Sequence, residues 1–543
     1  MSTIRFARVF TDNAVLQRNK PIRIWGFAKK NSKVTVEFAG NKSECTADDN
    51  GRFDVTFPQM DKGGPYTLSA FDDEGGSTKS SGIMTGDVII LCGQSNMEFP
   101  MVRVKETYPA EWEGKFDKLI RAFKVTENGV FTAPLADVET GQWNELAADT
   151  IDDYSAVGYF TAKHLRLQED VAVGLVDLTL GGVIMEAFMS PEMLEGFSDA
   201  LSEAEKFKDD TYRLKVLEDN EKNAQEWLSE LDKKDAGRIN RFEDGCRILK
   251  DGRDIVLPDF FSDTELAGFV GSLWIARTFT VPPEYVGKKA VLWFGAITDF
   301  DHCYLNGTFI GTTDYCYPPR RYEIPEGLIK DGENTLVFRI GVEKGYGRVT
   351  PGKLYGIVFG EGIRTTDSFT EGVDGADHIE HIGGVWKYII GCHMDPPQET
   401  VFVNWKPTAL YNGMLAPLAG MSVCAFAYYQ GESNCGKYTE YTELTHRFVR
   451  QIQDMWGDIP FICVQLPEFN TRMEEISFDH GEGWRGVMAA QEECTSIPGY
   501  HLVRSYGCGE LNDIHPQRKE PIGRMIAEVL CDLRDQKSGG QKV

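Results

Sequence analysis

The chain has 543 residues, of which 42% are hydrophobic and 26% charged, and its formal net charge is −26. Because a single hydrophobic core rarely grows beyond about 250–300 residues, we expect two or three structural units. The negative charge leaves no basic face for phosphate groups, so it argues against nucleic acid or an anionic membrane as a partner and favours a small or neutral ligand.

The first segment, residues 1–84, is predicted to form a small β-sandwich. Apolar and polar residues alternate over 22–26, 33–38 and 52–57, and Gly, Asn and Asp turns separate these stretches. This period of two is typical of strands that bury one face.

From residue 87 the sequence changes to an α/β pattern. Continuous apolar runs at 88–91 and 171–180 are typical of parallel strands buried on both faces, and 157–165 has the apolar spacing of a helix. The same pattern resumes late in the chain, with strands at 423–429 and 460–466, a helix at 438–456 and a last helix at 521–533. This alternation indicates one α/β layer built from two parts of the chain.

Two different segments separate these parts. Residues 199–238 are rich in Glu, Lys, Asp, Ala and Leu and contain no proline, so they predict a solvated helix or helical hairpin without a catalytic role. Residues 265–342 return to β patterning, with strands at 274–281, 290–294 and 334–340 and with Asn-Gly and Asp-Gly turns. We expect a jelly-roll or sandwich inserted into the α/β layer.

The predicted fold class is therefore α/β, with one β-sandwich at the N-terminus and a second one inserted. The bounds that we expect are an N-terminal sandwich at 1–84, the α/β domain at 85–198 and 381–535, a helical or irregular connector at 199–262, the inserted sandwich at 263–380 and a disordered tail at 536–543.

The compartment is predicted from three absences in the sequence. The chain begins without the apolar core of a signal peptide, and no stretch reaches the roughly 18 apolar residues of a membrane span. The twelve cysteines are irregularly spaced and form neither a CxxC motif nor a zinc-ligand set with histidines. We expect a cytoplasmic protein with reduced thiols and no metal or organic cofactor.

The first candidate site segment is Gly-Gln-Ser-Asn-Met at 93–97, directly after the strand at 88–91. A serine at the carboxyl end of a parallel strand lies at the sheet edge where α/β folds bind ligands. The N–H of Ser95 would lie near a helix N-terminus, which suits a developing oxyanion. Alone, the segment is more typical of a polar turn at a strand end than of a catalytic site.

Two further segments follow strands in the same layer. Gly181 and Gly182 leave their backbone N–H groups unshielded, as a second oxyanion donor requires. In the segment at 428–434, Gln430 and Asn434 carry side-chain N–H groups, and Glu432 could anchor a neighbouring loop. Each segment, taken singly, is also an ordinary strand-to-helix turn.

The fourth segment, Asn-Asp-Ile-His-Pro at 512–516, precedes the last helix. Histidine is the usual base for a serine nucleophile, and an acid must hold its other ring nitrogen in the right tautomer. His515 and Asp513 fit these two roles. The Gly-x-Ser-x-Gly elbow is absent, because Met97 replaces the second glycine, and acid and base lie almost side by side. Both facts point away from α/β-hydrolases and toward the SGNH arrangement.

The sequence resembles the sialate O-acetylesterase family, which groups with SGNH carbohydrate acetylesterases. The matching motifs are collinear over nearly the whole chain and lie at 10–18, 93–100, 155–160, 181–190, 410–417, 429–434 and 513–516. The resemblance implies Ser95 as nucleophile and His515 as base. It also implies an anion hole from the Ser95 amide, a Gly181 or Gly182 amide, and a polar side chain of the third segment. The resemblance also implies that residues 85–198 and 381–535 form a three-layer α/β/α SGNH hydrolase domain, and family members often carry a β-sandwich inserted in it.

The segments also supply four expected substrate-binding residues, Gln94, Asn96, Glu186 and Glu432. Two positions depart from the wider pattern. The residue three before the histidine is Asn512 rather than Asp, so Asp513 is the expected acid, and a Ser–His dyad is the alternative. Val183 stands where many relatives carry a small polar residue, and substrate preference could differ accordingly.

We therefore expect a serine esterase that removes O-acetyl groups from sugars through an acyl-enzyme. The substrate is an acetylated mono- or oligosaccharide, either a sialic acid or a neutral hemicellulose such as xylan, xyloglucan or mannan. Arg320 and Arg321 could bind the sialic acid carboxylate, but they could equally be surface charges. The rivals are a non-catalytic sugar-binding protein and a lipase-like SGNH enzyme, although no long apolar lid is evident. The oligomeric state is open, with a homodimer as one option.

Overall fold

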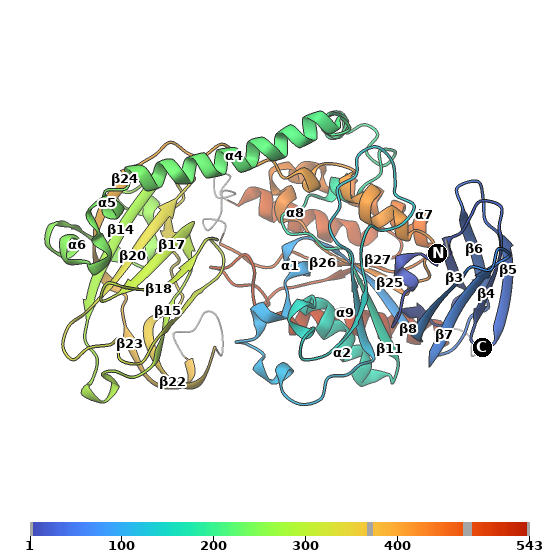
Figure 1. Cartoon of the computed structure of the whole chain (residues 1–543), viewed down its shortest axis with the longest axis horizontal. Coiled ribbons are helices and arrows are strands. Elements are labelled where there is room, and N and C mark those ends of the chain that lie inside the picture. Colours follow the sequence, from blue (N-terminus) through green and yellow to red (C-terminus); the bar gives the residue numbers. More distant parts are fainter. Residues whose placement is uncertain (1–3, 366–372, 471–480, 540–543) are drawn as a thin grey trace.

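The computed structural model describes residues 4–365, 373–470 and 481–539. Figure 1 shows three parts in a row: the inserted β region, a central α/β layer and the N-terminal strands. No helix in the described ranges is both long and apolar enough to cross a membrane.

The central layer is built on a seven-strand path with the order β10-β9-β11-β8-β25-β26-β27. Its neighbours are parallel, except that β10 runs antiparallel to β9. The strands are β8 (Ser77–Gly93), β9 (Ile120–Lys124), β10 (Trp143–Glu145), β11 (Ala172–Asp177), β25 (Ala425–Tyr429), β26 (Phe461–Val464) and β27 (Tyr500–Val503). Every residue of β11, β25 and β26 is buried, as apolar runs covered on both faces require.

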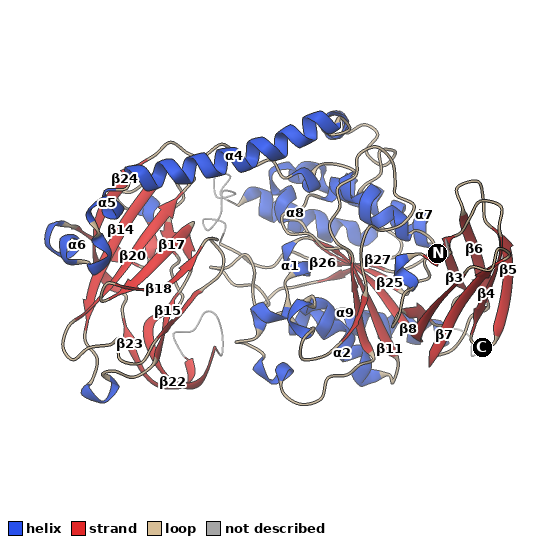
Figure 2. Ribbon diagram, in the orientation of Figure 1, coloured by secondary structure: helices blue, strands red, loops and turns tan. Residues whose placement is uncertain are grey.

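Helices cover both faces of this sheet (Figure 2). On one face α2 (Ala156–Gln168) packs against α9 (Glu520–Gly539), and on the other α7 (Tyr438–Trp456) packs against α8 (Glu482–Glu493). The Ser155 hydroxyl caps α2 by accepting the Gly158 N–H at 3.0 Å. The α7 sequence places its apolar residues at helical spacing, so one face is buried and the opposite face remains in water.

The N-terminal strands are continuous with the central layer. A three-stranded sheet holds β1 (Arg5–Phe6), β3 (Ile22–Phe27) and β6 (Arg52–Phe57), whereas β2 (Val15–Gln17), β4 (Lys33–Phe38), β5 (Asn41–Thr46) and β7 (Gly63–Asp72) join the sheet of β8. The first part of β8 pairs with β7, and its second part pairs with β11 and β25. The boundary predicted at residue 84 thus lies inside one strand of 17 residues.

A helical connector leads out of the central layer. It comprises α3 (Ser198–Lys206), α4 (Asp210–Lys234), α5 (Ala236–Asn240) and α6 (Cys246–Asp251). The Asp209 side chain caps α4 by accepting two backbone N–H groups. Of the 25 residues of α4, only Trp227 and Leu231 are buried, so this helix spans from the central layer to the inserted region with most of its surface in water (Figure 1).

The inserted region is a sandwich of two main sheets, in the orders β12-β24-β14-β20-β17-β18 and β19-β15-β22-β23, with a small third sheet β13-β21-β16. Its strands are β12 (Arg253–Leu257), β13 (Asp259–Phe260), β14 (Gly271–Phe279), β15 (Ala290–Phe294), β16 (Ile297–Thr298), β17 (Phe300–Leu305), β18 (Thr308–Thr313), β19 (Arg320–Ile324), β20 (Asn334–Val342), β21 (Arg348–Val349), β22 (Tyr355–Thr365), β23 (Val373–His381) and β24 (Gly384–His393). Rings from the two main sheets meet in the core, with Phe294 and Phe338 4.3 Å apart.

The observed elements also pass the predicted bounds of the inserted sandwich and of the tail. The sandwich extends beyond 263–380 on both sides, because β12 and β24 pair with each other and β24 also pairs with β14. The last helix, α9, continues to Gly539 and so enters the predicted tail, of which residues 540–543 lie outside the described residues.

Candidate active site

The candidate nucleophile lies at the carboxyl edge of the central sheet. The short helix α1 (Ser95–Glu98) begins directly after β8. Gly93 has φ +132°, and a Cβ there would lie 2.2 Å from the Tyr429 carbonyl oxygen, so this tight turn requires glycine. Because Ser95 is the first residue of α1, its N–H has no intrahelical acceptor.

The candidate base reaches the nucleophile from the loop between β27 and α9. The Nε2 atom of His515 lies 2.8 Å from the Ser95 Oγ. The Phe99 ring stacks on the imidazole at 5.8 Å, and the Tyr317 ring meets it edge-on at 4.6 Å. Burial lowers the pKa of His515 to about 4, against the opposing charge of Asp513. The imidazole is therefore neutral near pH 7 and able to accept a proton.

The Asp513 carboxylate lies beside this base. Its Oδ1 accepts the backbone N–H of His515 at 2.9 Å, and its Oδ2 accepts a hydrogen bond from Lys353 Nζ at 2.9 Å. Burial raises the pKa of Asp513, but Lys353 and His515 outweigh burial, so the pKa lies below its usual value. In the part of the chain that the structure describes, Asp513 acts on the His515 ring through its charge and not through a hydrogen bond to a ring nitrogen.

The glycine pair lies next to the nucleophile. The Gly181 N–H donates to Glu98 Oε2 at 2.7 Å. Gly182 has φ +73° and packs so closely on Trp405 that a Cβ would lie 2.1 Å from its ring. Within the described ranges, the Gly182 N–H donates to no protein acceptor. Of the two glycine amides, that of Gly182 is thus the one available to a ligand.

The third segment lies behind the glycine pair. The Gln430 Nε2 donates to Asn434 Oδ1 at 2.6 Å and to the Val183 carbonyl at 3.2 Å. Asn434 in turn donates to Glu186 Oε2 at 2.8 Å and accepts the Met185 N–H at 3.0 Å. Both amides are buried. These two predicted oxyanion donors therefore hold the segment after Gly182 in place.

A buried polar cluster lies beneath α1. The Asn96 Nδ2 donates to Glu432 Oε1 at 2.6 Å and to the Ile514 carbonyl at 2.9 Å, while its Oδ1 accepts from Lys519 Nζ at 2.5 Å. Burial lowers the pKa of Lys519 to about 8. Asn96 thereby links the nucleophile turn to the histidine loop.

The four residues predicted to bind substrate share one property, because all are buried and bonded within the protein. Gln94 accepts the Ser433 N–H at 3.2 Å, and the bonds of Asn96, Glu186 and Glu432 are those given above. These four residues therefore lie near the candidate site, where their hydrogen bonds hold the surrounding segments in place.

Four residues at the site carry no signal in the sequence. Tyr317 and Lys353 come from the inserted sandwich, Trp405 from the segment after it, and Lys519 from the turn before α9. Only the long-range packing of the domains places them here, since none belongs to a strand-end motif.

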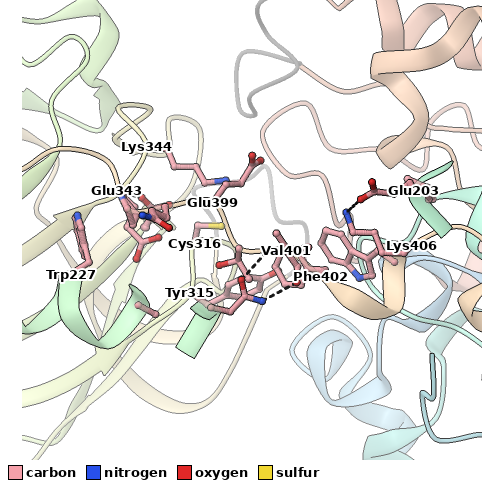
Figure 3. Close-up of a pocket in the computed structure, with 18 of the residues that line it drawn as sticks. Glu203, Trp227, Tyr315, Cys316, Glu343, Lys344, Glu399, Val401, Phe402 and Lys406 are labelled. Atoms are coloured by element: carbon pink, nitrogen blue, oxygen red, sulfur yellow. Dashed lines mark hydrogen bonds and ion pairs between the residues drawn. The ribbon is translucent and has the colours of Figure 1, made fainter. Parts of the chain in front are cut away.

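A cavity of about 940 Å³ is lined in part by Ile184 and Glu186, which follow the glycine pair in the sequence. Ser95 and His515 are not among its lining residues, but the lining residue Tyr315 contacts Tyr317, whose ring meets the His515 imidazole. Residues of the central layer, of α4 and of the sandwich all contribute to its walls, and Figure 3 shows aromatic and charged side chains together there. Four aromatic residues line it, namely Trp227, Tyr315, Phe402 and Trp405.

No protein-family model matches the chain. Among solved structures, a carbohydrate acetylesterase from Xanthomonas citri matches 97% of this chain and 74% of its own, with a TM-score of 0.55 and 19% identity. The β-glucuronidase of Ruminococcus gnavus matches 28% of this chain and 26% of its own, with a TM-score of 0.19 and 20% identity.

The chain therefore shares its fold with a carbohydrate acetylesterase over nearly its whole length. This confirms the predicted α/β fold with accompanying β-sheets at a coarse level. The narrower resemblance to sialate O-acetylesterases stays a prediction.

Proposed function

We propose that the protein is a serine esterase that removes O-acetyl groups from sugars by two-step acyl transfer. The observation that carries this proposal is the 2.8 Å contact between Ser95 Oγ and the Nε2 of a neutral, buried His515 at the carboxyl edge of a parallel sheet. The fold shared with a carbohydrate acetylesterase supports an acetylated sugar as substrate.

The mechanism follows from these atoms. His515 Nε2 takes the Ser95 proton while Oγ bonds to the acetyl carbonyl carbon, and the N–H groups of Ser95 and Gly182 receive the oxyanion. The imidazolium then protonates the sugar oxygen, which leaves as the alcohol. Finally His515 deprotonates a water molecule that attacks the acetyl carbonyl carbon. The bond between this carbon and Ser95 Oγ breaks, His515 returns the proton to Oγ, and acetate leaves. The negative charge of Asp513 stabilises the imidazolium in both halves.

The same site favours a neutral sugar over a sialic acid. Arg320 is fully buried with its Nε 2.6 Å from Asp301, and Arg321 lies over Trp293 with its Nε 3.1 Å from Glu106. Neither arginine is therefore available to bind a substrate carboxylate.

The cavity itself carries an excess of negative charge. Its lining includes seven carboxylates and three lysines, which are Glu186, Asp199, Glu203, Asp299, Asp314, Glu343, Glu399, Lys344, Lys406 and Lys437. One lysine, Lys406, is already paired with Glu203 at 2.9 Å (Figure 3). Aromatic faces with polar groups between them suit the flat faces and hydroxyl groups of a neutral oligosaccharide.

The decisive variant is Ser95→Ala. We expect it to lower acetate release from p-nitrophenyl acetate and from acetylated oligosaccharides by at least about 1,000-fold, because no nucleophile remains to form the acetyl-enzyme. Mass spectrometry should locate a fluorophosphonate adduct on Ser95 in the unaltered protein.

Ser229→Ala, on the exposed face of α4, is the matched control and should leave the rate unchanged. Full activity in Ser95→Ala, measured on protein free of host esterases, would reject the assignment.

A further inference from the structure

The inserted sandwich contacts the loop that carries the candidate base and acid. The turn between β21 and β22 lies against this loop, where the Asn512 Nδ2 donates to the Pro351 carbonyl at 2.9 Å. Two residues further on, Lys353 Nζ lies 2.9 Å from Asp513 Oδ2 and 3.7 Å from Glu510 Oε2. Tyr317, on the same sandwich, contacts the His515 ring.

The side chain of Lys353 carries an ammonium group and is only 8% exposed. Burying an ammonium group is costly unless carboxylates compensate it, and here Glu510 and Asp513 do so. The contact also fixes Asp513 at both oxygens, since Oδ1 binds the His515 N–H and Oδ2 binds Lys353. The carboxylate therefore has one defined orientation beside the base.

We propose that Lys353 is a positioning residue for the esterase reaction, which holds the Asp513 carboxylate ionised and oriented beside His515 from the inserted sandwich. This inference rests on the proposed function. The catalytic loop supplies the nucleophile's base and acid, and the sandwich supplies the cation that keeps the acid in place.

The charges around Asp513 determine the pH at which we expect activity to be lost. The groups that face it or its lysine partner are Lys353, Glu510, His515, Arg103, Lys519 and Arg321. Among these charges Lys353 has the largest effect in lowering the pKa of Asp513. Without Lys353 the pKa of Asp513 rises, so Asp513 takes up a proton at a higher pH than in the unaltered protein. Once protonated, Asp513 no longer carries the charge that stabilises the imidazolium, and activity should therefore be lost at higher pH.

The test compares Lys353→Met and Lys353→Gln with the unaltered full chain. We expect kcat to fall between about 10- and 100-fold with little change in KM, because the acid is misplaced while the substrate contacts remain. The acid limb of kcat/KM should move to higher pH, and Lys353→Arg should restore part of kcat. The Gln variant keeps a hydrogen-bond donor without charge, so it still reports on the charge if the Met variant unfolds.

Lys289→Met is the matched control, because it removes a lysine that pairs at 3.3 Å with Glu323 on the exposed surface of the same sandwich. It should leave kcat and the pH profile unchanged. Circular dichroism and thermal unfolding verify that each variant is folded.

A double-mutant cycle separates positioning from simple domain stability. In an Asp513→Asn background, Lys353→Met should change kcat by less than about twofold, because the partner is already lost. An equal loss in both backgrounds, or an unchanged kcat and pH profile in the folded Met and Gln variants, would overturn the role of Lys353. If the unaltered protein releases no acetate, it is the proposed function that fails.

Discussion

Two opposing influences set the protonation state of His515. Removal from water disfavours the imidazolium, and the nearby Asp513 charge favours it, with burial the stronger. The result is a base that stays uncharged well below neutral pH. In the proposed acyl transfer, the proton from Ser95 enters a site where Asp513 compensates the new positive charge.

The low pKa of His515 predicts how kcat/KM depends on pH. Since only the neutral imidazole accepts the Ser95 proton and its pKa is about 4, kcat/KM should be constant from about pH 5.5 to 7 and half-maximal near pH 4. The measurement is kcat/KM for a neutral acetyl ester in overlapping buffers. Half-loss near pH 6.5, the usual histidine value, would contradict it.

Folding must be followed in the same buffers. The unfolded chain takes up a proton at His515 as pH falls through about 6.5, whereas the folded chain does so only near 4. Acidification across this window therefore favours the unfolded state. Thermal unfolding at each pH separates loss of structure from titration of the base.

Some of the candidate site residues could be predicted from the sequence, and others could not. Ser95 was a candidate because it follows a strand of a parallel sheet, whose carboxyl edge binds ligands. His515 was a candidate because an acid, Asp513, lies two residues before it and the last helix follows. The buried positions of Gln430 and Asn434 could not be predicted, because a side-chain amide has the same donors whether it faces a ligand or a backbone carbonyl. Lys353 had no local signal at all, since its partner lies 160 residues away.

Among the elements, the glycine segment after β11 combines strain and close packing. Gly182 and Gly457 have nearly equal φ angles of 73° and 75°, yet only Gly182 abuts another group, the Trp405 ring. An added methyl group would therefore cost backbone strain at both positions, but would displace a neighbour at only one.

We predict that Gly182→Ala lowers kcat about 100- to 1,000-fold, because the displaced segment withdraws one oxyanion donor. Gly457→Ala, at the end of α7, should lower the melting temperature through backbone strain alone and leave kcat unchanged. Steady-state kinetics and thermal unfolding of both variants provide the comparison. Normal turnover by Gly182→Ala would exclude this segment from the oxyanion site.

Regular elements were predictable where one periodicity dominates. The helical spacing at 438–456 corresponds to α7, and the apolar run at 423–429 contains β25. The extent of β8 was not predictable, because its first half alternates like an exposed strand and its second half is continuously apolar. A change of environment along one strand looks, in sequence, like a domain boundary.

The negative charge of the whole molecule should favour a neutral sugar over an anionic one. The net charge of −26 and the acidic cavity both repel an anionic sugar, whereas they do not affect the approach of a neutral one. At low ionic strength we expect kcat/KM at least about tenfold higher for acetylated xylo-oligosaccharides than for an O-acetylated sialic acid.

Acetate release from both substrates at matched ester concentration tests this preference. Added salt should reduce the difference in kcat/KM between the two substrates, because salt screens the repulsion that only the anionic substrate experiences. A higher kcat/KM for the sialic acid would contradict the neutral-sugar proposal.

The place of β8 in the sheet has a consequence for how the chain is made. One edge of β8 can pair with β11 soon after synthesis, but its other edge awaits β25, which follows the whole inserted sandwich. At about 5–20 residues per second, the ribosome needs roughly 15 seconds to a minute to deliver β25 after β8. During that interval the strand that precedes Ser95 has an unpaired edge, of the kind that attracts other chains. The sandwich at 253–393 is contiguous in the sequence and can fold meanwhile, so the central sheet is completed only after the sandwich has been made.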